Sequence, residues 1–359
     1  MKVLFMYILP SGGMNTLNRV RARALRGAGI ESHLLFLRTG SGMGDIEPDI
    51  PVFYAAEPQA IGQILHAHAY DAVIVTSAYS YLPVLRGLGY TGKLIFENNG
   101  FGPPDQARQA MLDAKPHVDP CADALMYPGT RHIGDILRSL YPNKPIFSVF
   151  NPVDPAMFGY LPSRNNPDRP VLAWVGRLEP NKNWRDFLRI GAEVAKLLPR
   201  VHLWMFTDPE LAWPGETEAM ERLTAELGLA GRITHYTRIP HRLMPDYLSR
   251  VADSGGALVI TSVAESFAYT APEAILCRCP VVTTDSDGVR AVIENETTGL
   301  FYPHGDFAAG ARQVMRVLTQ PALRARLVAA GAQRIRTNLS PQRFAGLFAQ
   351  MLQILGIGR

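Results

Sequence analysis

The chain has 359 residues, 47% of them hydrophobic, with a formal net charge of +4 at pH 7 and three cysteines. This length and composition predict a folded protein with two domains of ordinary size. The basic excess is diffuse, with thirteen basic and thirteen acidic residues in 1–160, which argues against nucleic acid binding. Cys277 and Cys279 have no second pair to complete a zinc site, so we expect reduced thiols and no metal.

Short aliphatic and β-branched runs alternate with helical segments, the pattern of a parallel sheet covered by helices on both faces. A first set of strands is expected at Lys2–Leu9, Ser32–Leu37, Ala72–Thr76, Lys93–Glu97, Ala124–Tyr127 and Ile146–Phe150. A second set is expected at Val171–Val175, His202–Phe206, Ile233–Tyr236, Ala257–Thr261 and Val281–Thr284. The sequence therefore predicts two α/β units in tandem.

The opening apolar run, Val3–Leu9, ends at a proline and is too short for a membrane span or a secretory signal. We therefore interpret it as a buried strand of a cytoplasmic protein. The run Pro10-Ser11-Gly12-Gly13 leads from this strand into a helix. Glycines at the carboxyl end of a strand let backbone amides approach a phosphate, although a tight turn without a ligand explains them equally well.

The helix predicted at Asn15–Ala28 carries Arg19, Arg23 and Arg26 on one face. This face is either an ordinary solvated surface or a weak peripheral contact with anionic lipid at the inner side of a membrane. Arg21 falls nearer the apolar side of the helix, and we assign it no role.

Glu97, Asn98 and Asn99 end the predicted strand at Lys93–Glu97, at the sheet edge where α/β folds place their ligands. Two consecutive asparagines can form an ordinary turn. Alternatively, the carboxylate and the two amides suit sugar hydroxyls, and they are candidates for the acceptor or sugar side of a site.

Five prolines in residues 151–170 predict an irregular linker between domains. We therefore expect one Rossmann-like domain at residues 1–160 and a second at 161–339. A final helix is expected within 340–359, because apolar residues recur at helical spacing and Pro341 suits a first turn.

Two cations, Arg177 and Lys182, follow the predicted strand Val171–Val175. A diphosphate leaving group gains negative charge in the transition state, and a guanidinium with an ammonium would stabilise that charge. Two solvated side chains on a loop are the alternative.

Two carboxylates, Glu265 and Glu273, lie between the predicted strand Ala257–Thr261 and a predicted helix. Thr270 and Glu273 fit a capping box, which explains Glu273 structurally and leaves Glu265 without a structural role. Because a carboxylate accepts two hydrogen bonds well, the pair could bind vicinal hydroxyls of a sugar and a ribose.

In their order along the chain, these motifs resemble the GT-B-fold retaining glycosyltransferases of family 4, the glycosyl transferases group 1. The similarity covers Gly176-Arg177-Leu178 with Lys182, Glu265-Ser266-Phe267 with Glu273, Pro280-Val281-Val282, Gly288, Thr298-Gly299-Leu300 and Gly305-Asp306. In the first half it covers Gly12-Gly13 and Asn151-Pro152-Val153-Asp154 with Phe158. The resemblance implies two Rossmann-like, doubly wound domains that face a central cleft, and a C-terminal helix that crosses back to the first domain.

By this resemblance, Arg177 and Lys182 would bind the donor diphosphate, Glu273 the ribose and Glu265 the transferred sugar, with Arg177, Lys182 and Glu265 catalytic. Further donor-binding positions that it implies are Gly13, Arg238, Ile239, Ser266, Phe267, Ala268, Tyr269 and Thr270. It also implies a nucleotide-sugar substrate, UDP-sugar mildly favoured, and neither cofactor nor metal. Asp285-Ser286-Asp287 is then interpreted as a turn rather than a metal-binding motif.

The chain departs from the family pattern at four places. Ala268 and Arg278 replace usual glycines, Arg290-Ala291 replaces a usual Pro-Glu, and Glu97-Asn98-Asn99-Gly100 stands where the family often has a histidine. The Pro-Glu and histidine differences lie on the acceptor or sugar side, so they leave the acceptor open.

The sequence thus predicts a retaining glycosyltransferase that moves a sugar onto a hydroxyl of a glycan, a glycolipid or a small molecule. The alternative is a non-catalytic nucleotide-sugar-binding or partner subunit of a glycan-assembly system. Hydrolysis by a glutamate pair is disfavoured, because retention would need carboxyls about 5 Å apart across the scissile bond, whereas the resemblance places Glu273 on the ribose. The oligomeric state is not predicted.

Overall fold

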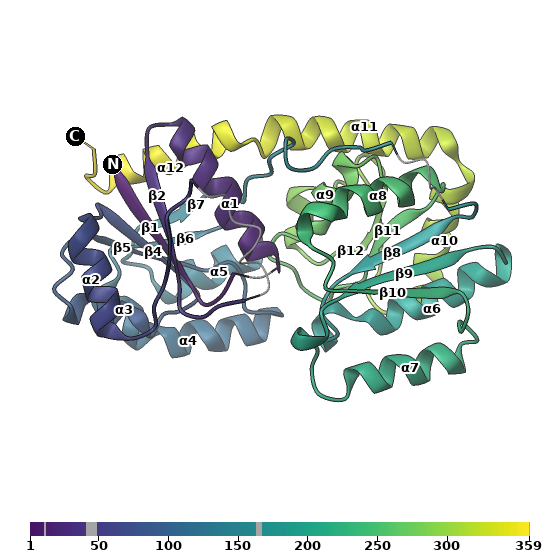
Figure 1. Ribbon diagram of the computed structural model, residues 1–359, viewed down its shortest axis with the longest axis horizontal. Helices are drawn as coiled ribbons and strands as arrows, with labels where there is room; N and C mark the ends of the chain where they lie inside the picture. Colours follow the sequence, from purple (N-terminus) through teal and green to yellow (C-terminus); the bar gives the residue numbers. More distant parts are fainter. Residues whose placement is uncertain (11, 41–48, 163–166, 359) are drawn as a thin grey trace. The chain divides into compact units, whose positions relative to one another are not determined.

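The computed structural model describes residues 1–10, 12–40, 49–162 and 167–358 (Figure 1). The chain divides into two compact units, one formed by Met1–Asp154 with Asn338–Arg359 and the other by Pro155–Thr337. Both boundaries fall slightly earlier than the sequence predicted. In the expected linker, residues 151–162 and 167–170 form neither helix nor strand, and residues 163–166 lie outside the described part.

The first unit contains a parallel sheet in the order β3-β2-β1-β4-β5-β6-β7. Its strands are β1 (Lys2–Tyr7), β2 (Glu31–Phe36), β3 (Val52–Tyr54), β4 (Ala72–Thr76), β5 (Lys93–Glu97), β6 (Ala124–Tyr127) and β7 (Ile146–Ser148). The bounds of β4, β5 and β6 are those predicted. The short edge strand β3 was missed, because none of its three residues is fully buried and no alternation marks it.

Helices cover both faces of this sheet, as the doubly wound prediction requires. One face packs against α1 (Gly12–Gly27) and α12 (Pro341–Ile354), with Val3 and Phe5 of β1 in the core between them. The other face, which includes Leu4 and Met6, packs against α2 (Pro58–His68), α3 (Tyr81–Gly87), α4 (Pro104–Cys121) and α5 (Arg131–Leu140). Figure 1 shows α12 beside α1, which confirms that the C-terminal helix returns to the first unit.

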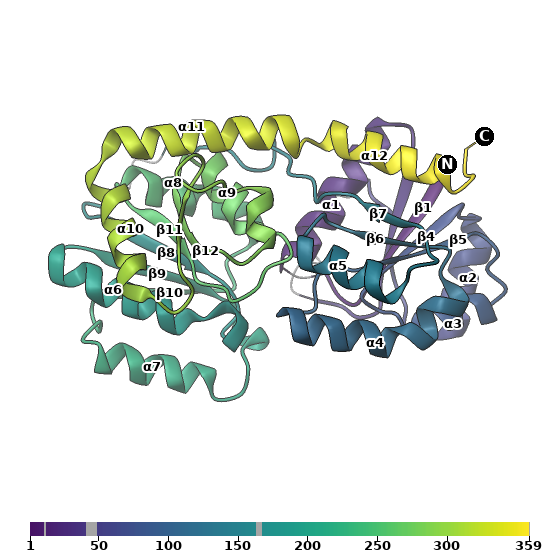
Figure 2. The same cartoon turned by 180° about the vertical axis from the view of Figure 1, so that it is seen from behind.

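The second unit contains a parallel sheet in the order β10-β9-β8-β11-β12-β13 (Figure 2). Its strands are β8 (Val171–Val175), β9 (His202–Thr207), β10 (Ile233–Thr237), β11 (Ala257–Ile260), β12 (Val281–Thr284) and β13 (Leu300–Tyr302). One face packs against α6 (Trp184–Leu197), α7 (Glu216–Glu226), α10 (Phe307–Thr319) and α11 (Pro321–Asn338). On the other face, α8 (Met244–Asp253) and α9 (Thr270–Leu276) contact β8, β11 and β12.

A buried ion pair between α1 and β5 explains Arg21. Its Nη1 lies 3.0 Å from both carboxylate oxygens of Glu97, and the two side chains are 1% and 4% exposed. Thr76 Oγ1 also donates to Glu97, and Arg21 Nη2 donates to Asn18 Oδ1 at 2.6 Å. The guanidinium lies 4.0 Å from the ring centroid of Phe5. Glu97, predicted as a candidate acceptor-side residue, is therefore engaged in the core of the first unit.

The other arginines of α1 do not form one exposed basic stripe. Arg19 is buried, Arg23 Nη1 lies 3.2 Å from Asp154 Oδ2, and Arg26 forms an ion pair with Asp49. The structure thus gives no support to the lipid-contact hypothesis. No helix in the described ranges is long and apolar enough to cross a membrane.

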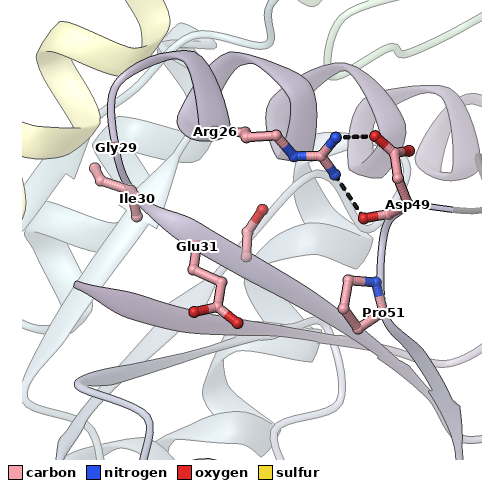
Figure 3. A pocket seen from close by; sticks show the side chains of 7 residues that line it. Arg26, Gly29, Ile30, Glu31, Asp49 and Pro51 are labelled. Carbon is pink, nitrogen blue, oxygen red and sulfur yellow. Dashed lines mark hydrogen bonds and ion pairs between the residues drawn. The ribbon is translucent and has the colours of Figure 1, made fainter.

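A hollow of about 320 Å³ lies at the amino end of β2, the opposite sheet edge from Glu97 (Figure 3). Its lining includes Arg26, Glu31, Ser32 and Asp49. In Figure 3 the Arg26 guanidinium is directed at Asp49, which satisfies both charges locally. The hollow includes none of the predicted site residues.

We expect Glu97→Ala to lower the free energy of unfolding by about 3–5 kcal/mol, because it leaves the buried Arg21 charge without a partner. Replacing both residues, Arg21→Met with Glu97→Leu, should recover most of this loss. Urea unfolding followed by circular dichroism measures both. The control, Asp119→Ala, removes an exposed pair with Lys115 and should cost less than about 1 kcal/mol. A similarly small cost for Glu97→Ala would contradict the buried-pair interpretation.

Candidate functional site

The two strands that precede the catalytic candidates are parallel neighbours, so their carboxyl ends meet at one edge of the second sheet. Lys182 ends the 3₁₀ turn η2 (Pro180–Lys182) after β8, and its Nζ lies 2.5 Å from Oε1 of Glu265. Ser262 Oγ donates to the same oxygen at 2.6 Å. The fold thus brings together two predicted catalytic residues that lie 83 positions apart.

Asn181 fastens these two loops to each other. Its Nδ2 donates to the carbonyl of Ala264 at 3.1 Å, and its Oδ1 accepts from the amide of Ala264 at 3.2 Å. Its own carbonyl accepts from the amide of Val263 at 2.8 Å. Thr261 Oγ1 donates to the carbonyl of Lys182 at 2.8 Å. These hydrogen bonds hold the backbone segments of Lys182 and Glu265 next to each other. The position of the ion pair is therefore set by the backbone contacts as well as by the attraction between its two charges.

The segment after β12 fixes the backbone of Glu265 from the other side. The amide of Glu265 donates to the carbonyl of Ser286 at 3.0 Å, and the amide of Gly288 donates to the carbonyl of Glu265 at 3.0 Å. A Cβ added to Gly288 would lie 2.2 Å from the carbonyl carbon of Ser266. Only glycine allows this approach, which gives the predicted motif glycine a physical reason.

Asp285-Ser286-Asp287 forms the bend between β12 and the 3₁₀ turn η5 (Gly288–Ala291). Asp285 pairs with Arg290, whose hydrogen bond holds the pKa of the Asp285 carboxyl below its usual value. Asp287 has φ of 61°, a turn conformation. In the described part of the chain, no three His, Cys, Asp or Glu side chains are grouped so that they could hold a metal ion.

Arg177 lies directly after β8 and Gly176. Its Nη2 donates to Oε1 of Glu179 at 3.0 Å, and the arginine side chain is 51% exposed while the glutamate is 6% exposed. A Cβ placed on Gly176 would lie 3.5 Å from Cβ of Lys182, so the two cations project from adjoining backbone. Glu179, which sequence analysis did not single out, orients the Arg177 guanidinium.

The capping-box prediction for Glu273 is wrong. Helix α9 already begins at Thr270, its N-cap position is Tyr269, and no side chain caps it. Instead, Oε1 of Glu273 lies 2.9 Å from Nε2 of His241, with the glutamate side chain 7% and the histidine 23% exposed. Glu273 therefore has a partner from another element, and sequence analysis missed His241.

The remaining donor-binding candidates of the second unit lie between Glu265 and the first turn of α9, and on the loop after β10. Phe267 and Ala268 are buried in the loop before α9, and the rings of Phe267 and Tyr269 are 4.8 Å apart. Arg238 follows β10 with φ of 54°, and its Nη2 lies 3.3 Å from Oε1 of Glu210. Ser266 lies beside Phe267, Thr270 is the first residue of α9, and Ile239 follows Arg238.

The other candidates belong to the first unit. Gly13 lies in the first turn of α1, and Ser11 of the same run lies outside the described residues. Asn98 Oδ1 accepts from the amide of Gly100 at 2.8 Å, and Asn99 Oδ1 accepts from Nδ2 of Asn151 at 3.1 Å. Both asparagines are buried, and the Nδ2 of each has no hydrogen-bond partner among the residues that the structure describes.

Ala268 and Arg278, which replace usual family glycines, have φ of 60° and 62°. We expect Ala268→Gly to raise the melting temperature, because the left-handed region costs a residue with a Cβ about 1–2 kcal/mol. The matched control is Ala329→Gly in the exposed interior of α11, which should lower stability by roughly 0.5–1 kcal/mol. Thermal unfolding gives the melting temperature of both variants. A decrease in the melting temperature of Ala268→Gly equal to that of the control would contradict the inferred backbone strain at Ala268.

Two curated relatives illustrate the similarity in sequence. The 2-deoxystreptamine N-acetyl-D-glucosaminyltransferase of Streptomyces fradiae is 29% identical over 164 residues, which span 45% of this chain and 37% of that protein. The D-inositol 3-phosphate glycosyltransferase of Frankia alni is 30% identical over 191 residues, which span 52% and 46%. The chain therefore matches less than half the length of each of these relatives.

Solved structures resemble the whole chain. Sucrose-phosphate synthase from Thermosynechococcus elongatus aligns with a TM-score of 0.81, 18% identity and 99% coverage of both chains. HepE of Anabaena, in complex with UDP-glucose, aligns with a TM-score of 0.83, 16% identity and coverage of 99% of this chain and 100% of HepE. Residues 162–334 match the model of the glycosyl transferases group 1. The chain thus has the GT-B fold, and its match to the glycosyl transferases group 1 lies within the second unit.

Proposed function

We propose that the chain is a retaining glycosyltransferase that moves a sugar from a nucleoside diphosphate sugar to a hydroxyl group. The observation that carries this proposal is the Lys182–Glu265 ion pair, which lies next to Arg177 in the loops that follow the adjacent carboxyl ends of β8 and β11. The names of both curated relatives, each a transferase of sugars, agree with it. The binding of UDP-glucose by HepE favours UDP as the nucleotide.

The cations would hold the diphosphate. An ammonium has three N–H donors, so Lys182 can bind Glu265 with one and phosphate oxygens with the others. Arg177 uses one Nη on Glu179, and half of its side chain remains exposed. Because both cations are held before the donor arrives, they would stabilise the leaving group without reorganisation.

The proposed step has the acceptor oxygen attack the anomeric carbon from the face that the phosphate leaves. The bond between the anomeric carbon and the phosphate oxygen breaks, a bond to the acceptor oxygen forms, and the acceptor proton passes to the departing phosphate. Configuration is therefore retained. Arg177 and Lys182 supply the positive charge, so the proposal includes no metal and no cofactor.

The acceptor would be oriented by Asn98 and Asn99 of the first unit. Each amide uses its oxygen within the protein, and its Nδ2, which is buried and has no partner among the described residues, is the donor that the proposal assigns to a hydroxyl oxygen of the acceptor. Glu97 is no longer part of this proposal as a direct contact, because Arg21 and Thr76 occupy its carboxylate.

A non-catalytic sugar-nucleotide-binding subunit is the alternative function. The two are separated by incubating the chain with UDP-glucose and a panel of hydroxyl acceptors and measuring free UDP. The proposal predicts acceptor-dependent UDP release. Thermal stabilisation by UDP-glucose without release on any acceptor would favour the alternative.

We expect Arg177→Ala and Lys182→Ala each to lower turnover by about 10²- to 10³-fold, the cost of losing one preorganised donor to the leaving group. Steady-state UDP release measures this effect, and melting temperatures should stay close to that of the wild type. The control is Lys196→Ala, which removes an exposed lysine of α6 that forms an ion pair with Glu193 of the same helix. Turnover near the wild-type value in both site variants would contradict the assignment.

Glu265→Ala should abolish the tighter binding that we expect the wild type to show for UDP-glucose over UDP. If Glu265 binds sugar hydroxyls, the variant will bind UDP almost as well as the wild type does but gain nothing from the added glucose. Calorimetric titration with UDP and with UDP-glucose gives the two affinities. Equal losses for both ligands would place the carboxylate on another part of the donor.

A further inference from the structure

We infer that His241 is a positioning residue that orients the Glu273 carboxylate for the ribose and couples ribose binding to the loop that carries the donor-binding candidates Arg238 and Ile239. The inference rests on the proposed function, with Glu273 taken to bind the ribose hydroxyls of the donor as the family resemblance implies. His241 itself touches no reacting atom in this account. Its role is to set the direction of a carboxylate that belongs to a different element.

His241 begins the 3₁₀ turn η4 (His241–Leu243), directly after the loop Thr237–Pro240 that follows β10. Glu273 lies on α9, after β11. Their side chains meet at 2.9 Å between Nε2 and Oε1, across 32 positions of sequence. A single hydrogen bond therefore joins the turn that follows the Arg238–Ile239 loop to the proposed ribose carboxylate.

The imidazole is also confined on a second side. The ring of Phe158 lies 4.9 Å from the ring of His241 at an interplanar angle of 52°, and Phe158 is buried. Rotation of the histidine about χ1 would break both the ring contact with Phe158 and the contact with Glu273. The position of Nε2, and with it that of the carboxylate, is thereby fixed.

The geometry leaves Glu273 able to bind a ligand. Two carboxylate oxygens offer about four lone-pair sites, and the contact with His241 occupies one of them on Oε1. Two ribose hydroxyls can then donate to the remaining sites. A carboxylate held in one rotamer binds them without the entropy cost of ordering its side chain. Movement of the loop that carries Arg238 and Ile239 would shift His241 and so weaken the ribose contact.

The test compares the nucleoside diphosphate that binds most tightly, among UDP, GDP and ADP, with its 2′,3′-dideoxy analogue. Calorimetry gives the affinity of each ligand for the wild type, His241→Ala, His241→Gln, Glu273→Gln and the double variant His241→Ala with Glu273→Gln. The control is His66→Ala, an exposed histidine on α2 of the first unit. Melting temperatures are measured for every variant.

We expect His241→Ala to weaken the affinity for the ribose form about tenfold or more, the factor that typically corresponds to one hydrogen bond to a charged group. The affinity for the dideoxy form should not change. His241→Gln, which keeps an N–H donor, should recover part of the loss. The alanine substitution should add little in the Glu273→Gln background, because the two residues act through one contact.

Two different failures can be told apart. If Glu273→Gln weakens only the ribose form but His241→Ala weakens both forms equally or neither, the positioning role is overturned and the ribose assignment stands. If Glu273→Gln does not distinguish the two ligands, Glu273 does not bind the ribose, and both the assignment and the inference fail. Loss of both ligands together with a lowered melting temperature in His241→Ala and His241→Gln would make His241 merely structural.

Discussion

The close parallel pairing of β11 with β8 is the constraint on which the candidate site depends. A Cβ added to Gly256, just before β11, would lie 1.8 Å from the carbonyl oxygen of Val171 in β8, so only glycine allows the strands this close. The pairing brings the loop that holds Lys182 next to the loop that holds Glu265. The strand β12 pairs with the other edge of β11. The segment that follows β12 therefore lies next to the Glu265 loop, and Ser286 and Gly288 form hydrogen bonds with the backbone of Glu265.

The exposed fraction of each charged side chain distinguishes the charges that stabilise the fold from those that a ligand can reach. Arg21 and Glu97 are 1% and 4% exposed and satisfy each other inside the first unit. In the second unit, Arg177 is paired with a glutamate but remains 51% exposed, and Lys182 remains 23% exposed. Paired but accessible cations are oriented before a ligand arrives, which is the arrangement that electrostatic stabilisation of a leaving group requires.

Sequence patterns located the buried strands well, because parallel strands are continuous apolar runs bounded by turn residues. They missed β3 and β13, which have three residues each and lie at sheet edges. The motif residues Lys182 and Glu265 were found, but their pairing was not, because no local signal reports a contact across 83 positions. For the same reason Glu97 was a candidate for ligand binding, with an ordinary turn as the alternative, and its ion pair with Arg21 was not foreseen. The local match of Thr270 to a capping box likewise concealed the distant partner of Glu273.

The central claim is that the second unit binds a nucleoside diphosphate sugar at the joined ends of β8 and β11. Thermal unfolding of the intact chain with UDP-glucose, GDP-glucose and ADP-glucose tests it most directly. A ligand present at 100 times its dissociation constant stabilises the folded state by about 2.7 kcal/mol. The account predicts that one of these donors, with UDP-glucose favoured, raises the melting temperature in a concentration-dependent way by several degrees. No shift with any of the three at millimolar concentration would contradict it.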